Sequence, residues 1–169
     1  MVNWLPACGT CELCLAGRPN ICERLATTTF VGFLPDGTSR LSRADGTPLM
    51  HYLSASTMAE YMVLPEIGVI PFPADVPFEI AAIIGCAVVT GAGAAFNTAR
   101  VRAGRPAAVI GCGGVGLSAL IGCHAAGCHP LIAIDTQPHK LELARELGAS
   151  ATLNPKDGDI VEGLKRLTR

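Results

Sequence analysis

The stretch VIGCGGVGL, residues 109–117, decides the fold. It contains the pattern G-x-G-x-x-G, with an apolar run before it and a helix-compatible run after it. In a dinucleotide-binding turn, the first glycine permits a tight bend, the second lets a pyrophosphate approach the backbone, and the third lets the helix pack closely on the strand. We expect the phosphates to contact Gly111, Gly113, Gly114, Val115 and Gly116, because amide groups at a helix N-terminus attract anions. Taken alone, the pattern also fits a close-packed glycine turn without a ligand.

The residues around this turn alternate between short apolar runs and helical patterns. The sequence predicts strands over 107–110, 131–134 and 151–153, and helices over 114–126, 138–147 and from 160 onwards. Such a β-α-β-α-β-α order indicates a parallel sheet with crossover helices, the first half of a Rossmann domain. Gly148 is placed to end the second helix. The fold class is therefore α/β.

An acidic residue follows the second predicted strand. Asp135 lies 19 residues after Gly116. A carboxylate there can accept hydrogen bonds from the adenosine ribose and would repel the 2′-phosphate of NADP. Thr136 follows it and no arginine is near, which favours NAD over NADP. Lys140, one helical turn further on, either reaches the ribose or lies on an ordinary solvated helix face.

Four cysteines near the start have the spacing of a metal site. Cys8, Cys11, Cys14 and Cys22 form C-x-x-C-x-x-C-x(7)-C. Four thiolates hold zinc in a closed tetrahedron, which is typical of a structural rather than a catalytic site. The alternatives are disulfides, free thiols or a redox Cys-x-x-Cys pair, but the first residues lack a basic start and an apolar stretch and so do not form an export signal. We therefore expect bound zinc and a cytoplasmic protein.

Composition sets further limits. The chain has 169 residues and a formal charge of −1; half of the residues are apolar and 16% are charged. This composition is globular, and the net charge gives no argument for binding nucleic acid or an anionic membrane. Two long apolar stretches, 80–96 and 107–123, are broken by glycines and are slightly short for a membrane span. We expect both to form buried strand–turn–helix units.

The region between the cysteines and the glycine turn predicts short strands and turns. Residues 58–64 and 68–72 have strand patterns, and Asp75 with Pro77 indicates a helix start. The expected domains are residues 1–87 and 88–169. Composition alone makes Cys86 a buried core cysteine, like three others further along the chain: Cys112, Cys123 and Cys128.

In this order, the motifs resemble those of the zinc-containing medium-chain alcohol dehydrogenases over nearly the whole chain. Segments 35–40, 51–52, 56–57 and 60–61 are similar to the class III, glutathione-dependent branch. The resemblance implies a partial GroES-like β catalytic domain whose cysteine lobe holds structural zinc, followed by a partial Rossmann domain that binds NAD. It also implies that Cys86 is a ligand of the catalytic zinc and that Thr90 lies near the nicotinamide.

The resemblance has limits that bear on activity. In the family, the other catalytic-zinc ligands precede the cysteine lobe, and the Rossmann sheet has six strands rather than three. The implied chain is therefore truncated at both ends and inactive, or nearly so, in isolation. The family reaction is hydride transfer between a primary or secondary alcohol, or an aldehyde, and NAD; Ala26 stands where glutathione-dependent members usually carry arginine.

Two alternatives remain for the function. One is a catalytically inactive module that binds nucleotide and zinc, with the open edge of strand 107–110 pairing into a homo-oligomer. The other is a zinc-free quinone-type reductase, against which the four-cysteine lobe argues. We expect a small-molecule substrate, and neither nucleic acid nor membrane as a partner.

Overall fold

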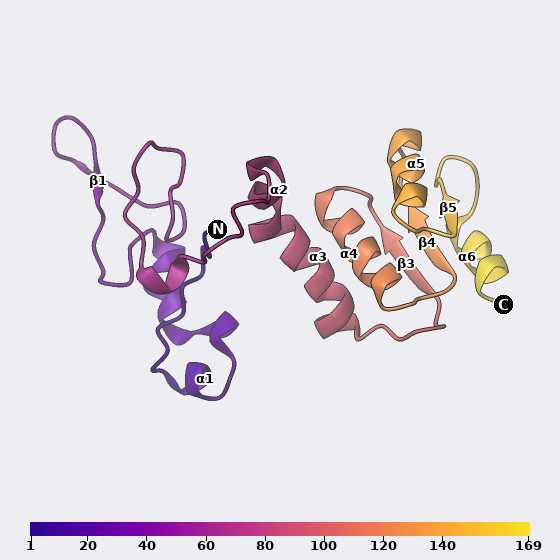
Figure 1. The fold of residues 1–169 in the computed structure, drawn as a ribbon, viewed down its shortest axis with the longest axis horizontal. Helices are drawn as coiled ribbons and strands as arrows, with labels where there is room; N and C mark the ends of the chain where they lie inside the picture. Colours follow the sequence, from indigo (N-terminus) through magenta and orange to yellow (C-terminus); the bar gives the residue numbers. More distant parts are fainter. The chain divides into compact units, whose positions relative to one another are not determined.

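The computed structural model describes all 169 residues, which form two compact units, Met1–Pro77 and Phe78–Arg169 (Figure 1). The boundary between the units lies in the sequence where a long helix begins, ten residues before the domain boundary expected after residue 87. Residues 78–87 belong to the second unit because they are the first turns of this helix.

The first unit is built from short elements. They are α1 (Glu12–Leu15), four 3-10 turns, η1 (Pro19–Ile21), η2 (Glu23–Ala26), η3 (Thr29–Val31) and η4 (Glu66–Gly68), and an antiparallel pair, β1 (Leu41–Ser42) and β2 (Pro48–Leu49). Leu25 and Leu34 are buried, together with the polar side chains of Thr29, Ser54 and His51. The Thr29 and Ser54 hydroxyls share a 2.6 Å hydrogen bond. A small, partly polar core therefore holds this unit together.

The two strands expected between residues 58 and 72 are not formed. Residues 58–64 have irregular backbone, and of residues 68–72 only Val69 makes an isolated bridge, to Val2. The prediction was wrong because a strand is stabilised by cross-strand neighbours. Met58 and Tyr61 are highly exposed and have no such neighbours.

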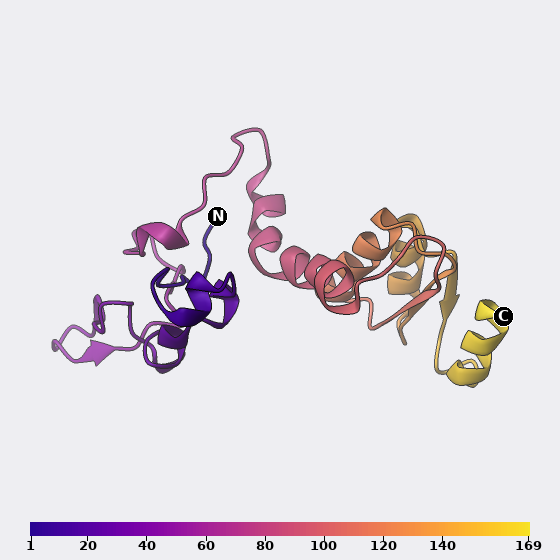
Figure 2. The same cartoon turned by 90° about the horizontal axis from the view of Figure 1, so that it is seen from below.

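The second unit begins with one continuous helical segment, Phe78–Ala99, visible in Figure 2. It comprises α2 (Phe78–Ile83), the π-helical turn η5 (Ile84–Val88), α3 (Val89–Gly93) and the π-helical turn η6 (Ala94–Ala99). The expected strand–turn–helix over 80–96 is therefore wrong, because a short apolar run does not distinguish a strand from a helix. With 22 residues, the segment is long and apolar enough to cross a membrane by length and composition alone.

Small residues pack this helix against α4 (Gly114–Ala125). A Cβ built on Gly91 would lie 2.6 Å from both the Ala119 nitrogen and the Ser118 Cβ. Further along, a Cβ on Gly122 would lie 3.1 Å from the Ala95 Cβ. The two helices thus approach so closely that only glycine fits at Gly91, and a side chain at Gly122 would require Ala95 to shift by a few tenths of an ångström. Away from these crossings the helix is mostly exposed, with only 11% of its most apolar window buried, so the burial expected for residues 80–96 is also wrong.

The remainder of the unit is the predicted parallel sheet. Strands β3 (Ala107–Ile110), β4 (Leu131–Ile134) and β5 (Ala151–Leu153) pair in the order β3-β4-β5. Helices α4, α5 (Pro138–Glu146) and α6 (Ile160–Thr168) follow them in turn. All four residues of β4 are buried, whereas β3 lies at an edge and its Ile110 is 79% exposed. These strands and helices confirm the predicted ones, including the strand–turn–helix over 107–123.

Candidate nucleotide and metal sites

The turn between β3 and α4 has the geometry that its glycines predict. Gly111 has a φ of +90°, which favours glycine. A Cβ on Gly116 would lie 2.9 Å from the Gly111 carbonyl carbon and closer still to its oxygen. A Cβ built on Gly113 would have no other atom within 4 Å. The first and third glycines therefore shape the turn, while the second leaves its backbone open to a ligand.

Asp135 is held beside this turn by backbone amides. Its Oδ2 accepts a 2.8 Å hydrogen bond from the Cys112 N–H, and its Oδ1 accepts one of 2.9 Å from the Gln137 N–H. The Cys112 N–H is the main cause that lowers the pKa of Asp135, and the Lys140 ammonium adds to the effect. The carboxylate is therefore ionised and fixed in orientation at neutral pH.

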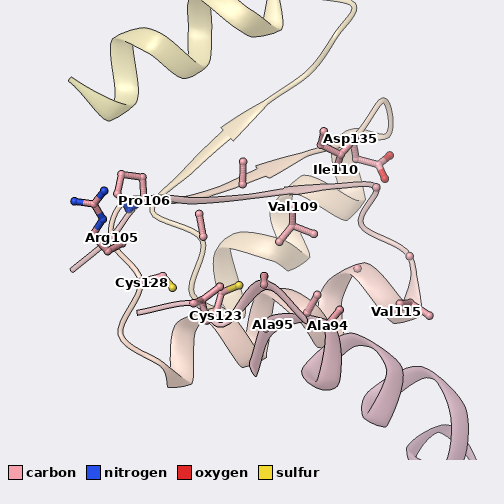
Figure 3. Close-up of a pocket in the computed structure, with 18 of the residues that line it drawn as sticks. Ala94, Ala95, Arg105, Pro106, Val109, Ile110, Val115, Cys123, Cys128 and Asp135 are labelled. Atoms are coloured by element: carbon pink, nitrogen blue, oxygen red, sulfur yellow. The ribbon is translucent and has the colours of Figure 1, made fainter. Parts of the chain in front are cut away.

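A cavity of about 1160 Å³ joins these groups (Figure 3). Apolar residues of η6 and β3 make up much of its wall, and three arginines of the loop before β3 also contribute. Every residue predicted to bind the cofactor lines this cavity: Gly111, Gly113, Gly114, Val115, Gly116, Asp135 and Lys140. The structure thus brings the predicted nucleotide residues together, and Lys140 lies beside Asp135 rather than on a remote helix face.

Cys86 and Thr90 lie on the helix that packs against α4. Cys86 is in η5 and Thr90 is in α3, and both side chains are exposed. The interpretation of Cys86 as a buried core cysteine is wrong, since its helix presents it to solvent. A Cβ built on Gly114 would lie 3.5 Å from the Cβ of the adjacent Ala87, so this helix runs next to the glycine turn. Within its own unit, Cys86 belongs to no cluster of three or more metal-binding side chains.

The four N-terminal cysteines do form such a cluster. The sulfurs of Cys8, Cys11, Cys14 and Cys22 all lie within 4.8 Å of one another. A tetrahedral zinc ion with Zn–S bonds of about 2.3 Å would place its sulfurs roughly 3.8 Å apart. A small contraction would therefore let all four bind one ion. The donor set is all sulfur, which suits zinc in a closed structural site.

Backbone amides prepare this cluster for thiolate charge. The Thr10 and Cys11 N–H groups point at the Cys8 sulfur, at 3.4 and 3.3 Å. With the Thr10 N–H as the main cause, the pKa of Cys8 falls to about 5. The Cys14 backbone is the main cause that lowers the pKa of Cys11. Burial, together with the adjacent Cys11 thiol, raises the pKa of Cys14 to about 12. A cation bound among the sulfurs would favour the thiolate form of all four.

Comparison with known proteins shows the family of the chain. The sequence model of the zinc-binding dehydrogenase family matches residues 114–169. Over 98% of its length, the chain is 42% identical to an S-(hydroxymethyl)glutathione dehydrogenase from Paracoccus denitrificans. Over 91% of its length, it is 42% identical to a class-3 alcohol dehydrogenase from Drosophila melanogaster. The chain belongs to the zinc-containing alcohol dehydrogenase family.

Solved structures of this dehydrogenase family also share the fold. A crystal structure of an alcohol dehydrogenase zinc-binding domain protein from Burkholderia ambifaria matches 96% of the chain with a TM-score of 0.87 and 37% identity. A benzyl alcohol dehydrogenase from Acinetobacter calcoaceticus matches the same share with a TM-score of 0.81 and 31% identity. The chain spans 44% of the Paracoccus relative, 40% of the Drosophila relative, and 44% and 43% of these two structures.

Sequence reasoning missed several features of this chain. The close approach of Gly91 to α4 was not expected, although the run of small residues Thr90–Ala95 is a signal for tight helix packing. The place of Cys123 and Cys128 in the cavity wall was also missed. Their expected burial is confirmed, as is that of Cys112. The signal that could have predicted their position is Gly127 between them, because glycine commonly ends a helix.

Proposed function

We propose that this chain provides the adenosine half of the NAD site and the structural zinc site of a zinc-dependent alcohol dehydrogenase. The proposed reaction of the whole enzyme transfers hydride between a primary or secondary alcohol, or an aldehyde, and NAD. The observation that carries the proposal is the joint placement of the glycine turn and the amide-bound Asp135 in one cavity.

The proposed NAD contacts follow from this geometry. The pyrophosphate would lie against the open backbone at Gly113 and against the first amides of α4, including those of Gly114 and Val115. The Asp135 carboxylate would accept hydrogen bonds from the ribose hydroxyls, with Lys140 beside it. Because Asp135 is held ionised, it would repel the extra phosphate of NADP, so we propose NAD as the cofactor.

The zinc proposed for the N-terminal unit is structural. The four sulfurs fit a tetrahedral ion, and they leave no ligand position for a substrate. Bound zinc would hold together a loop that buries few apolar side chains of its own. Structural zinc binding can contribute on the order of 10 kcal/mol to folding, which suits this loop.

For the catalytic centre, we propose Cys86 as a zinc ligand and Thr90 as a nicotinamide contact. Cys86 is an exposed thiol on a helix that lies beside the glycine turn. One thiol does not make a zinc site, and its unit offers no further cluster of metal-binding side chains. Relatives that are alcohol dehydrogenases favour an alcohol or aldehyde substrate, while Ala26 argues against a glutathione-linked one.

A second candidate is a nucleotide- and zinc-binding module without turnover, favoured by the single ligand at Cys86. In that case the exposed edge of β3 would pair with a second copy of the chain. We propose the cytoplasm as the location for either candidate.

Titration with NADH tests the nucleotide site that both candidates share, and a turnover assay tests the inactive module. We expect a fluorescence change on binding, weaker binding of NADPH, and weaker binding of NADH to Asp135→Ser. Absence of NADH binding by the folded chain would overturn the proposed nucleotide site. In a parallel assay of alcohol-dependent NADH formation, we expect little or no turnover by the 169 residues alone. A rate typical of an intact dehydrogenase would refute the inactive module.

A further inference from the structure

The C-terminal end of α4 closes with a Schellman motif that contains two cysteines. The Cys128 N–H donates to the Cys123 carbonyl at 3.0 Å, and the Gly127 N–H donates to the His124 carbonyl at 2.9 Å. Gly127 has a φ of +76°, as the motif requires. In this motif, a side-chain contact between the positions of Cys123 and Cys128 is frequent. The backbone therefore brings these two thiols together.

The two side chains are buried and line the same cavity, and Figure 3 labels both of them at one end of it. Cys128 is also one of the groups that raise the pKa of the Cys123 thiol, after burial. Cys123 is 5% exposed and Cys128 is 7% exposed. Both line the cavity, so a small neutral molecule can approach them from that side. The Cys128 thiol also lies 3.8 Å from the Arg102 carbonyl oxygen.

We propose that Cys123 and Cys128 are an oxidative modification site, at which hydrogen peroxide forms an intrachain disulfide. The thiolate of one cysteine attacks a peroxide oxygen and the O–O bond breaks, which gives a sulfenic acid and hydroxide; the hydroxide takes up the proton that the thiol released and becomes water. The second sulfur then attacks the sulfenic sulfur, the S–O bond breaks, and a second water leaves with the thiol proton. Two thiols are oxidised by two electrons, and one peroxide is reduced to two waters.

The position of the pair sets the consequences. A disulfide would link the end of α4 covalently to the turn before β4, away from the glycine turn at the start of α4. Burial raises the pKa of the Cys123 thiol and so keeps its thiolate fraction small at neutral pH. Oxidation is therefore slow, and the bond persists after the peroxide is removed until a dithiol reductant reaches it.

Peptide mapping of the zinc-loaded 169-residue protein tests the proposal, because bound zinc occupies the other four-cysteine cluster. The protein is exposed to hydrogen peroxide, unfolded in excess N-ethylmaleimide and digested with trypsin. Residues 103–140 form one tryptic peptide, since the Arg105–Pro106 bond resists trypsin. We expect this peptide to carry one maleimide, on Cys112, and an internal disulfide between the other two cysteines. Dithiothreitol before alkylation should restore all three maleimides.

Variants serve as controls. Cys112→Ala should keep the disulfide, and Cys128→Ala should abolish it without creating another in the same peptide. The wild-type map decides the matter even where a variant folds poorly. Three maleimides on the peroxide-treated wild-type peptide would overturn the proposal. So would sulfinic acids at Cys123 and Cys128 without a disulfide, or a disulfide that involves Cys112.

Discussion

Gly116→Ala should destabilise the second unit because of backbone contact rather than lost side-chain packing. The added Cβ would lie 2.9 Å from the Gly111 carbonyl carbon and nearer to its oxygen. Carbon atoms pack at about 3.5–4.0 Å, so α4 and the turn must separate by at least roughly 0.6 Å. Both groups are main chain and neither can rotate away. We expect a cost at the upper end of overpacking substitutions, about 3 kcal/mol.

Gly113→Ala is the matched control from the same turn. Its Cβ meets no atom within 4 Å, and its φ of −84° suits alanine. We expect its free energy of unfolding to stay within about 0.5 kcal/mol of wild type. By thermal denaturation followed with circular dichroism, Gly116→Ala should lower the Tm of this unit by roughly 12–24 °C, and Gly113→Ala should leave it nearly unchanged.

Gly113→Ala should weaken nucleotide binding, although it leaves the stability of the unit nearly unchanged. The added methyl at Gly113 would stand where the pyrophosphate must approach the backbone. We expect at least about a tenfold rise in the Kd for NADH, which corresponds to about 1.4 kcal/mol. A Gly116→Ala protein with wild-type Tm would refute the packing argument. Wild-type NADH affinity in Gly113→Ala would refute the phosphate site.

Three further predictions concern the other titratable and metal-binding groups. Burial lowers the pKa of His51, so the folded first unit favours neutral imidazole, and its stability should fall as the pH drops below about 6.5. His51→Gln, which can still accept the Arg40 N–H, should flatten this loss in urea unfolding at several pH values; identical profiles would contradict it. Mass spectrometry should find one zinc ion per wild-type chain and less zinc in Cys22→Ser. Both this substitution and a strong chelator should unfold the cysteine loop. Full zinc retention by the variant would count against the four-sulfur site. Asp135→Ser should raise the Kd for NADH about tenfold or more while improving NADPH binding, and an unchanged NADH/NADPH ratio in fluorescence titration would exclude its role.

The strands and helices of the second unit from β3 onwards could be predicted from the sequence because their signals are local. Each strand from β3 to β5 is a short apolar run bounded by turn residues, and each helix has its own start and stop. The helix start expected from Asp75 and Pro77 is confirmed by α2, but the strand expected inside 80–96 is wrong because this apolar run carries no periodicity that separates a helix from a strand. The contact that decides it, Gly91 against α4, joins segments whose pairing the sequence does not reveal. The irregular backbone over 58–64 has the same cause, since strand propensity does not provide a partner.

The two candidate sites depend on the fold to different degrees. The cysteine cluster closes within one loop, so residue spacing alone predicts it. The nucleotide site instead depends on the pairing of two parallel strands, in which Ile110 lies opposite Ile134 and the Gly111 N–H donates to the Ile134 carbonyl at 2.8 Å. This register places Asp135 at the turn.

A register slip would therefore break the nucleotide site without changing any of its residues. A shift of one residue moves a strand by about 3.3 Å, which is more than the 2.8 Å bond from the Cys112 N–H to Asp135 could span. The buried side chains of β4 prevent this slip, because it would turn its packed residues toward the opposite face of the sheet. The core of the sheet thus determines where the carboxylate lies, and a polar substitution inside β4 should weaken NADH binding even though no β4 side chain contacts the proposed ligand.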